Sequence, residues 1–472
     1  MLVHIIEKEL RDIVGSAKFA VNFSIGTALI LLSFYTGAQN HRIAQEQHEA
    51  ALAANVRQYE GVTDWMRVQS FRIFLPPQPV AALVNGVSND IGRTVEVRGR
   101  GELRSQDSRY GDDPIFAMFR FLDLDFIVTV ILTLFAVLFG YDAVNGEKER
   151  GTLRLTFANA VPRTVFITGK CAGTFLGLAV PLIIPFLLGA LLLPVFGVPM
   201  SGPDWTALAL VTGAGLLTMG AYLLLSVWVS ARTERSSTSF LVLLSVWIMT
   251  VIVLPRLSAA GADLFVSVPS MDEVNSQKSR FMSQLWNEDR TKMNGFTPAN
   301  KGDVQEVMKE FNRYMQTLAD DREKRFNEFA GRLNEERANR QMEHRRLTQY
   351  LSCLSPAALF TLAASELAGT SLRLEEEYLA QAREYQKEYA RFMKEKTGTN
   401  TGGFAMVFRM VTDDNAEKPK PINIAEVPAF RFVPPAAEAG LPPFTIFSGT
   451  IALYALLSFA GAYRAFRTYD VR

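Results

Sequence analysis

Residues 121–141 read FLDLDFIVTVILTLFAVLFGY, and residues 142–164 directly after them read DAVNGEKERGTLRLTFANAVPRT. The first stretch is apolar over about 20 residues, the length that a helix needs to cross the hydrocarbon core of a bilayer. The second stretch changes abruptly to a dense mixture of acids and bases around Glu147–Arg150. This juxtaposition predicts a spanning helix that leaves the membrane into a charged loop.

Other stretches of the chain have the same length and apolar character. The predicted spans lie at residues 19–38, 121–141, 165–196, 205–229, 240–257 and 444–466. The third is longer than a span requires and contains Pro181, Pro185 and Pro194, so we expect a kinked helix or a re-entrant end. The core of a soluble protein does not account for six such runs. The sequence therefore predicts an α-helical integral membrane protein with six transmembrane helices.

Loop charge predicts the orientation of these spans. Lys and Arg gather at residues 142–164, in the loop after the fourth span and beyond the sixth, whereas residues 197–204 contain none. Because positively charged short loops stay in the cytoplasm, we expect both termini inside. The two long loops, residues 39–120 and 258–443, are then extracytoplasmic.

The first extracytoplasmic region begins with a run of good helix formers at residues 41–62, which extends the first span outward. RTVEVRGRGEL at residues 93–103 alternates in polarity and predicts a short strand. In the second region, residues 302–351 and 372–396 predict two long helices that form a hairpin or packed pair.

An apolar patch, LSPAALFTLAASELAG at residues 354–369, separates these two helices. It is too short to span a bilayer. It is either the buried turn of the helix pair or a segment on the membrane face, and we favour the second. Farther on, FAMVFRMVT at residues 404–412 and PAFRFV at residues 428–433 predict strands. The expected extracytoplasmic part is therefore mainly helical with a few strands.

The amino-terminal segment, residues 1–18, predicts an amphipathic helix. Its apolar residues fall on one stripe, which includes Ile6, Leu10 and Ile13, and its charged residues lie elsewhere. Such a helix lies in the membrane interface. The alternative is a frayed lead-in to the first span, which we favour less.

The charged loop at residues 142–164 predicts a contact surface for a soluble partner. Thr152, Leu153 and Leu155 start a short amphipathic helix that Pro162 ends, so the loop offers both polar and apolar groups. The alternative is an ordinary charged turn that only sets topology.

Three charges lie close to the outer ends of spans. Asp123 and Asp125 begin the second span, and Arg256 ends the fifth. They either pair across the bundle as an outer gate or are solvated among lipid headgroups. We favour solvation, because charges at the ends of a span cost far less than charges at its midplane.

Composition and motifs argue against several other functions. The net charge of +1 attracts no nucleic acid, and the 2 cysteines are far apart in sequence, so we expect no disulfide. GVSNDIGRT at residues 86–94 has the wrong spacing for a P-loop, and no catalytic triad is evident. His41 and His48 are two helical turns apart, too far to chelate one ion together. We expect neither catalysis nor a metal site.

Several of these elements resemble one known family. Asp142 at the end of the second span, EKERGTL at residues 147–153, Pro162–Arg163 and Gly169–Lys170 together resemble the permease subunits of type-two ABC transporters. Residues 108–128, the SPAALF…LAGTSL segment and the terminal AFRTYDVR are similar to one bacterial branch with enlarged outer loops. That branch is often described as a permease for multicopper-enzyme maturation. Copper fits poorly here, because His is rare and Met is scattered.

The resemblance implies a bacterial inner-membrane protein that works with a separate ATPase subunit. ATP and Mg would bind to that subunit, and this chain would carry no cofactor. The loop residues implied to dock there, together with the amino-terminal helix, are Glu147, Lys148, Glu149, Arg150, Gly151, Thr152 and Arg154. The family is usually an obligate dimer, here a homodimer or a pair with a related permease.

We therefore expect the permease subunit of an ATP-driven transporter that exports or extracts a lipid-like, peptide or natural-product substrate. The alternative is a membrane scaffold or mechanotransmission protein whose outer domains bind a periplasmic partner without moving a solute. A secondary transporter is less consistent with the sequence, since the spans lack a proton or sodium ligand set.

Overall fold

The computed structural model describes residues 1–86, 88, 92–99, 103–106, 122–158, 161–297, 304–397, 421–435 and 437–468. Most of these residues are helical, and six helices are long and apolar enough to cross a membrane. The six lie at Ala17–Arg57, Leu124–Glu149, Arg163–Val195, Gly202–Ser230, Ser236–Phe265 and Leu441–Arg467. The predicted fold class is therefore confirmed.

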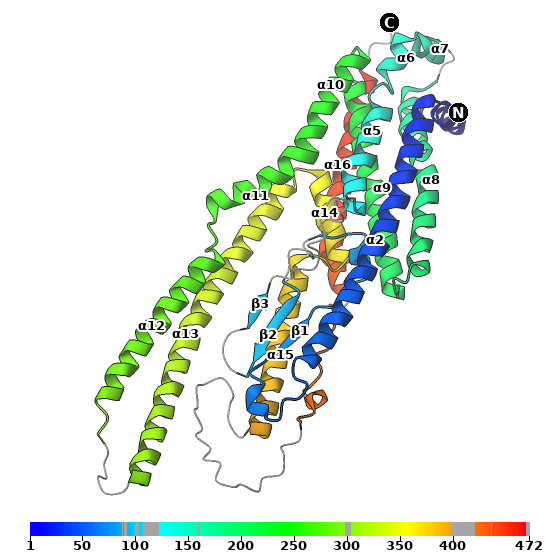
Figure 1. Cartoon of the computed structure of the whole chain (residues 1–472). Coiled ribbons are helices and arrows are strands. Elements are labelled where there is room, and N and C mark those ends of the chain that lie inside the picture. Colours follow the sequence, from blue (N-terminus) through cyan, green and yellow to red (C-terminus); the bar gives the residue numbers. More distant parts are fainter. Residues whose placement is uncertain are drawn as a thin grey trace.

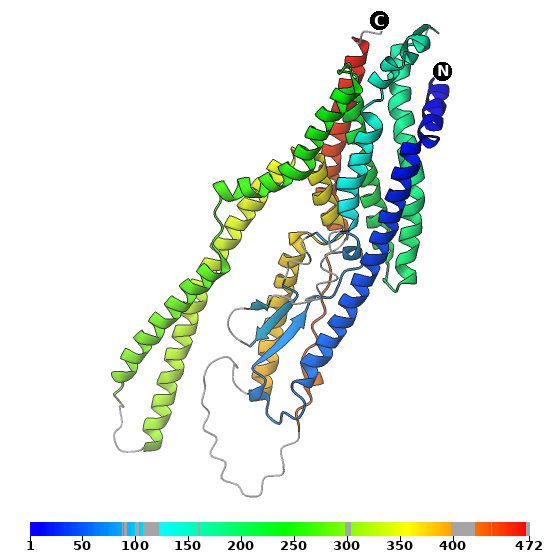
Figure 2. The same ribbon diagram turned by 45° about the horizontal axis from the view of Figure 1, so that its top comes forward.

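The molecule has two distinct ends (Figures 1 and 2). Both termini lie at one end of the helical bundle, together with the short helices α6 (Asn145–Glu149) and α7 (Thr152–Ala158). A small sheet and a long helical hairpin project from the opposite end. We call these the terminal end and the far end.

Helix α9 (Gly202–Ser230) lies at the centre of the bundle. It packs against α16 (Leu441–Arg467) and α5 (Thr133–Gly140), while α2 (Ala17–Arg57) packs mainly against α8 (Arg163–Val195). Small residues let these helices approach: a side chain at Gly189 of α8 would overlap the ring of Phe34. The bundle is therefore held by close packing, since lipid provides no hydrophobic force between helices.

The predicted third span, a kinked helix or one with a re-entrant end, is observed as a single helix, α8. It runs as one helix of 33 residues from Arg163 to Val195 and contains Pro181, Pro185 and Pro194 within it. The prediction of a re-entrant end is wrong. The chain reverses only after α8, where Gly197 has a φ of 84°, a backbone conformation that suits glycine.

The second and fifth spans each contain a π-helical segment. Their parts are α4 (Leu124–Phe126), η3 (Ile127–Leu132) and α5 in the second, and α10 (Ser236–Trp247), η4 (Ile248–Val253) and α11 (Leu254–Phe265) in the fifth. Trp247 Nε1 donates a hydrogen bond to Thr133 Oγ1 at 2.9 Å and joins the two spans beside these segments. Wide turns of this kind release backbone carbonyls from regular pairing. One of them, Thr250 O, accepts a hydrogen bond from Ser355 Oγ.

Helix α14 (Pro356–Leu367) contains the apolar patch, and both predicted placements of the patch are wrong. It neither forms the turn of a helix pair nor lies on the membrane face. It is inserted into the far end of the bundle, where it packs against α16, α9 and both π segments. Leu359 and Phe360 are fully buried there, and Thr361 Oγ1 donates to Asp125 Oδ1 at 2.8 Å. A short apolar run can become core when neighbouring helices surround it.

The long hairpin is made of α12 (Met271–Asn294) and α13 (Val304–Ser352). The two predicted long helices are confirmed as α13 and α15 (Leu372–Thr397), but their pairing with each other is wrong. Helix α13 packs against α12 and α11 instead. Across the α12–α13 hairpin, Phe281 stacks on Phe329 at 4.2 Å between ring centroids.

Helix α15 covers a three-stranded antiparallel sheet. The strands are β1 (Ser70–Phe74), β2 (Thr94–Arg98) and β3 (Arg104–Gln106), in the order β1-β2-β3 with Ser70 opposite Arg98. The predicted strand in residues 93–103 is therefore confirmed. Tyr378 Oη donates to Ile73 O at 3.0 Å, and burial raises the pKa of Tyr389, which keeps it a neutral donor.

Residues 428–433 do not form the predicted strand, although Phe430 and Phe432 pack against Tyr378. The other predicted strand, residues 404–412, lies outside the described residues. Short one-turn helices complete the described chain, at Trp65–Arg67, Val80–Ala82, Ile424–Glu426 and Ala437–Gly440.

The insertion of α14 predicts that Phe360 stabilises the whole far end of the bundle. We expect Phe360→Ala to lower the free energy of unfolding by about 3–5 kcal/mol, because a large buried ring leaves a cavity. Thermal unfolding of the detergent-purified chain measures the loss as a lower midpoint. Leu354→Ala is the control, since Leu354 is exposed just before α14. Equal midpoints for the two variants would show that α14 does not contribute core packing.

Candidate functional site

Four charged side chains meet at the terminal end and form what we call the ion cluster: Lys8, Glu9, Glu147 and Lys170. Lys170 Nζ lies 2.9 Å from Glu9 Oε1 and 2.8 Å from Glu147 Oε1. Lys8 Nζ lies 3.1 Å from the same oxygen of Glu147. The cluster therefore joins three elements distant in sequence: α1 (Leu2–Val14), α6 and α8.

The ion cluster is buried apart from Lys8. Lys170, Glu147 and Glu9 are 3, 5 and 7% exposed, whereas half of the Lys8 side chain is accessible. Burying a charge costs several kcal/mol unless opposite charges and hydrogen bonds compensate. Two cations and two anions meet here, and Glu147 Oε2 is buried without a partner among the described residues. Such a cluster specifies one arrangement of its three helices, because removing any buried member exposes the others to that cost.

A stripe of glycines on α8 brings α1 close enough to form the ion cluster. Gly169, Gly173 and Gly177 recur every fourth residue and so lie on one face of the helix. A Cβ added to Gly173 would lie 2.7 Å from the Cβ of Glu9, and one added to Gly169 would lie 2.8 Å from Ile5. The glycine stripe is therefore the groove that holds α1.

The order of these contacts gives the direction of α1. Ile5 lies at Gly169, Glu9 at Gly173 and Ile13 at Gly177, so α1 runs alongside α8. Ile6 and Ile13, which we expected to face lipid, contact α8, and Leu10 is half-buried. The amphipathic helix is present, but much of its apolar face is covered by protein.

The charged loop divides into a buried and an exposed part. Glu147 belongs to the ion cluster, and Lys148 is half-buried. The exposed residues form what we call the loop rim: Glu149, Arg150, Gly151, Thr152, Arg154 and Leu155. The seven residues that resembled a partner-binding loop are therefore not equivalent, since Glu147 is inaccessible to a soluble protein.

The loop rim is held in a defined conformation. Glu149 accepts hydrogen bonds from the backbone N and the hydroxyl of Ser236 and so fixes the start of α10 to the loop. Arg150 Nε donates to Gly146 O at 3.0 Å, and Gly151 has a φ of 76°. The side chain of Thr152 donates to Glu147 O at 3.2 Å. The loop rim is thus a shaped surface attached to the fifth span.

Aromatic packing attaches α7 to the last span. Phe166 of α8 stacks on Phe466 of α16 with ring centroids 5.1 Å apart, and Phe157 of α7 lies against both rings. Arg163 Nη1 donates to Arg467 O at 2.6 Å. Contacts therefore connect the loop to the third, fifth and sixth spans, so a movement of the loop rim would be transmitted to them.

The predicted outer gate is not assembled in the structure. Asp123 caps α4 by accepting from the backbone N of Phe126 at 2.9 Å, and Asp125 accepts from Thr361. Arg256 is exposed on α11, and no ion pair with either acid is found among the described residues. Arg256 is exposed, as solvation predicts, whereas Asp123 and Asp125 are half-buried and accept hydrogen bonds from α4 and α14.

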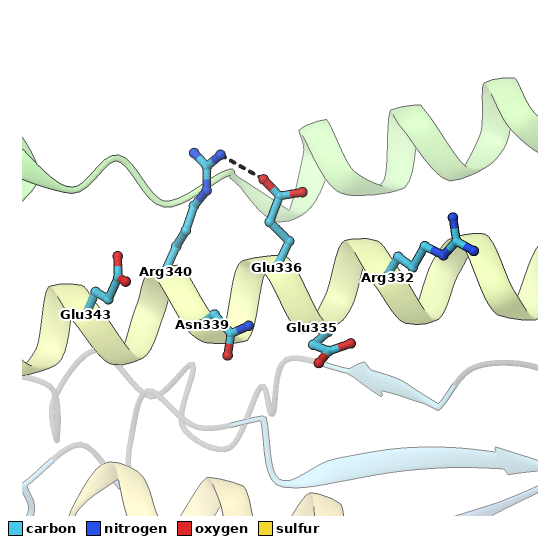
Figure 3. A pocket seen from close by; sticks show the side chains of 6 residues that line it. All are labelled: Arg332, Glu335, Glu336, Asn339, Arg340 and Glu343. Atoms are coloured by element: carbon cyan, nitrogen blue, oxygen red, sulfur yellow. Dashed lines mark hydrogen bonds and ion pairs between the residues drawn. The ribbon is translucent and has the colours of Figure 1, made fainter.

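No cluster of three His, Cys, Asp or Glu residues in the described part of the chain could hold a metal ion. Cys171 and Cys353 are free thiols. An open depression of about 340 Å³ lies on α13, and its lining side chains are drawn in Figure 3. It is lined by Arg332, Glu335, Glu336, Asn339, Arg340 and Glu343. All six come from one helix, and the pair Arg340–Glu336 is an ordinary contact between successive turns.

Sequence reasoning missed Lys8, Glu9 and Lys170 as members of the site. One signal was present: Lys170 is a lone cation inside a long apolar run, where a charge needs a partner. A second signal was the glycine at every fourth residue close to Lys170, at Gly169, Gly173 and Gly177. Neither signal identifies which helix fills the groove, because that contact joins residues 161 positions apart.

The ion cluster predicts a characteristic response to neutralising substitutions. Lys170→Met is expected to destabilise the chain by about 3–5 kcal/mol, because buried Glu9 loses Lys170, the only cation that pairs with it among the described residues. The triple variant Glu9→Gln, Glu147→Gln and Lys170→Met should recover most of that loss, since no unpaired buried charge remains. Thermal unfolding of the purified variants gives the comparison. A triple variant no more stable than Lys170→Met would refute a mainly electrostatic role.

The glycine groove predicts that a larger side chain displaces α1. Gly173→Leu should raise the rate of tryptic cleavage at Arg11 several-fold, because the new side chain overlaps Glu9. Gly213→Leu is the matched control, since Gly213 lies in a spanning helix with open space around its Cβ position. Peptide mapping after timed digestion measures both. Equal cleavage rates would contradict the close packing of α1 on α8.

The comparisons with known proteins agree with this architecture. Residues 3–470 match a family described as ABC-2 family transporter protein. A search of the curated proteins finds no match.

Proposed function

Because the chain belongs to the ABC-2 transporter family and is thus a membrane transport permease, we propose that it is the membrane subunit of an ATP-driven transporter. In this proposal a separate ATPase subunit binds ATP and Mg and docks on the loop rim. The observation that carries the proposal is the ion cluster, which joins the loop to α1 and α8 directly behind the loop rim. A push on the loop rim would therefore move three helices together.

The proposal requires the terminal end to face the cytoplasm. The basic residues of the short loops support this orientation, since positively charged loops stay inside. At the terminal end, Lys148 lies in α6, Arg150 lies between α6 and α7, and Arg154 lies in α7. Arg163 begins α8 there, and Arg464 lies in the last turn of α16. The chain would then lie in the bacterial inner membrane with both termini inside, and the sheet and α12–α13 hairpin would be periplasmic.

A second permease, either another copy or a related chain, would complete the transport pathway. The fifth span supports this, because only 17% of its most apolar window is buried within one chain. Its α10 and η4 segments expose large apolar side chains, namely Leu241, Val242, Ile248, Met249 and Ile252. In the proposed dimer, the second and fifth spans of each copy line a central cleft. The π segments of both spans would then lie beside that cleft.

The proposed substrate is lipid-like, a peptide or a natural product, and the proposed direction is export or extraction. The lack of acidic or basic residues in the middle of the predicted spans supports this, because paths for ions and small polar solutes usually contain them. The far end would receive or guide the substrate, or contact a periplasmic partner.

A scaffold or mechanotransmission protein is the second candidate. The observation that favours it is the α12–α13 hairpin, which reaches far beyond the bundle (Figures 1 and 2). In that case the ATPase would drive movement of the hairpin without transport of a solute.

The loop rim provides the test of coupling. We expect the double variant Arg154→Glu, Leu155→Asp to abolish stimulation of the copurified ATPase by this chain, because both side chains are exposed and available to a partner. Thermal stability should stay at the wild-type level. ATP hydrolysis in proteoliposomes that contain both subunits is the measurement.

Arg464→Glu is the control for the charge reversal, since it makes the same change of charge as Arg154→Glu at an exposed position of the terminal end outside the loop rim. It should leave the stimulation unchanged. Normal stimulation in the double variant would remove the loop rim from the coupling surface. Glu147→Lys is a poor test, because it places a third cation in the ion cluster and would disrupt the fold.

A further inference from the structure

Helix α11 continues the fifth span beyond the length that a bilayer requires. Helix α10 has 12 residues and η4 has 6, so together they are about 27 Å long at 1.5 Å per residue. That length nearly crosses a hydrocarbon core of about 30 Å. The 12 residues of α11 therefore begin at the level of the lipid headgroups on the far side.

Helix α11 also bends away from the axis of α10, in both views of the molecule (Figures 1 and 2). The π segment precedes α11, and Pro255 in the first turn of α11 cannot donate a backbone hydrogen bond to the preceding turn, both of which are causes of helix bending. A helix that leaves the bilayer normal at headgroup depth runs along the membrane surface. Its direction and depth thus place α11 at the boundary between lipid and water.

The residues of α11 form three faces. Ser258 and Ala262 are buried on the face toward α13, where Gly261 lies against Leu351. Arg256 and Asp263 make a polar face, and Asp263 pairs with His344 of α13 at 2.8 Å.

The third face of α11 is apolar and exposed. Leu257 and Leu264 lie two helical turns apart on this face and are 55 and 85% exposed, and the neighbouring Phe265 is 80% exposed. Soluble surfaces rarely combine such side chains in one patch.

The end of α13 extends this apolar face. Leu351 of α13 contacts α11, and two side chains close to it in the chain, Tyr350 and Leu354, are exposed. Tyrosine is enriched at membrane interfaces, where its ring enters the apolar layer and its hydroxyl stays in water. Exposed apolar side chains thus occur both on α11, which continues a span, and at the end of α13, which packs against α11.

We propose that α11 and the end of α13 dock on the lipid surface of the far leaflet, with Leu257, Leu264 and Phe265 among the acyl chains. The partner is the bilayer, because the surface continues a span and separates apolar from polar residues at headgroup depth. The α12–α13 hairpin then leaves the membrane from a base anchored in lipid, independently of which substrate is moved. Arg256 lies on the polar face of the anchor.

Spin-label accessibility tests this proposal on the full chain in lipid nanodiscs. Single cysteines at Leu257, Leu264 and Arg256 receive a nitroxide, and power saturation measures collisions with oxygen and with a water-soluble nickel chelate. Leu187→Cys is the lipid reference, from an exposed position in α8, and Met308→Cys is the water reference, from the α12–α13 hairpin. The labelled wild-type chain gives the background from Cys171 and Cys353.

The expected result is that labels at Leu257 and Leu264 resemble Leu187. They should collide often with oxygen and several-fold less with nickel than the label at Met308. The label at Arg256 should collide more with nickel than the label at Leu257. Nickel collisions at Leu264 equal to those at Met308 would place the face in water and overturn the proposal. Low collision rates with both reagents would show that protein, such as a second copy, covers the face. That result would also overturn the proposal.

Discussion

Hydrocarbon supplies no partner for a polar group, and this constraint explains most of the unusual features of the bundle. Where the second and fifth spans widen into π turns, polar side chains of the protein provide the partners that water would otherwise provide. Ser355 bonds to a carbonyl released by the fifth span, and Trp247 bonds to Thr133 of the second. Thr361 satisfies Asp125. Helix α14 is inserted where these groups occur, so its position follows from the need to satisfy them.

The same constraint gives the ion cluster its specificity. Lys170 can remain charged in a buried position only while Glu9 and Glu147 surround it, and those two acids come from different elements. The glycine groove makes the approach possible, because any side chain at Gly173 would hold α1 away from α8. Close packing and charge pairing thus depend on each other. Together they make α1, the loop and the start of α8 one mechanical unit.

Local features of the sequence predicted the spans and the longest helices well. A run of about 20 apolar residues is a local property, and so is the helical periodicity that placed a helix at residues 302–351, where α13 has Val304–Ser352. The alternation around Val95 and Val97 likewise identified β2. Each of these signals lies within the element it predicts.

Which helices pack against each other could not be predicted in the same way. Helix α12 is mostly polar, and its contacts with α13, such as Asp289 with Arg322, join residues 33 positions apart on two separate helices. The buried position of α14 was equally hidden, since a short apolar run suits a surface anchor as well as a core. For the ion cluster, the sequence showed an unexplained lysine and a glycine repeat, but the groove had no identifiable occupant. The amphipathic pattern of α1 predicted contact with lipid. A glycine groove in the protein and the membrane interface both favour a helix with one apolar face, so the pattern does not distinguish between them.

The length of α13 determines how far a small rearrangement of the bundle would move the tip of the α12–α13 hairpin. Its 49 residues make a rod about 74 Å long, fixed at one end by its contacts with α11 and the chain leading into α14. A tilt of about 5° at that pivot sweeps the opposite tip through about 6 Å, more than the spacing of one helical turn. Helix α13 is thus a lever arm, because a small tilt at its base moves its tip much farther than the base. A small movement of the spans at that pivot would therefore be amplified at the tip of the hairpin.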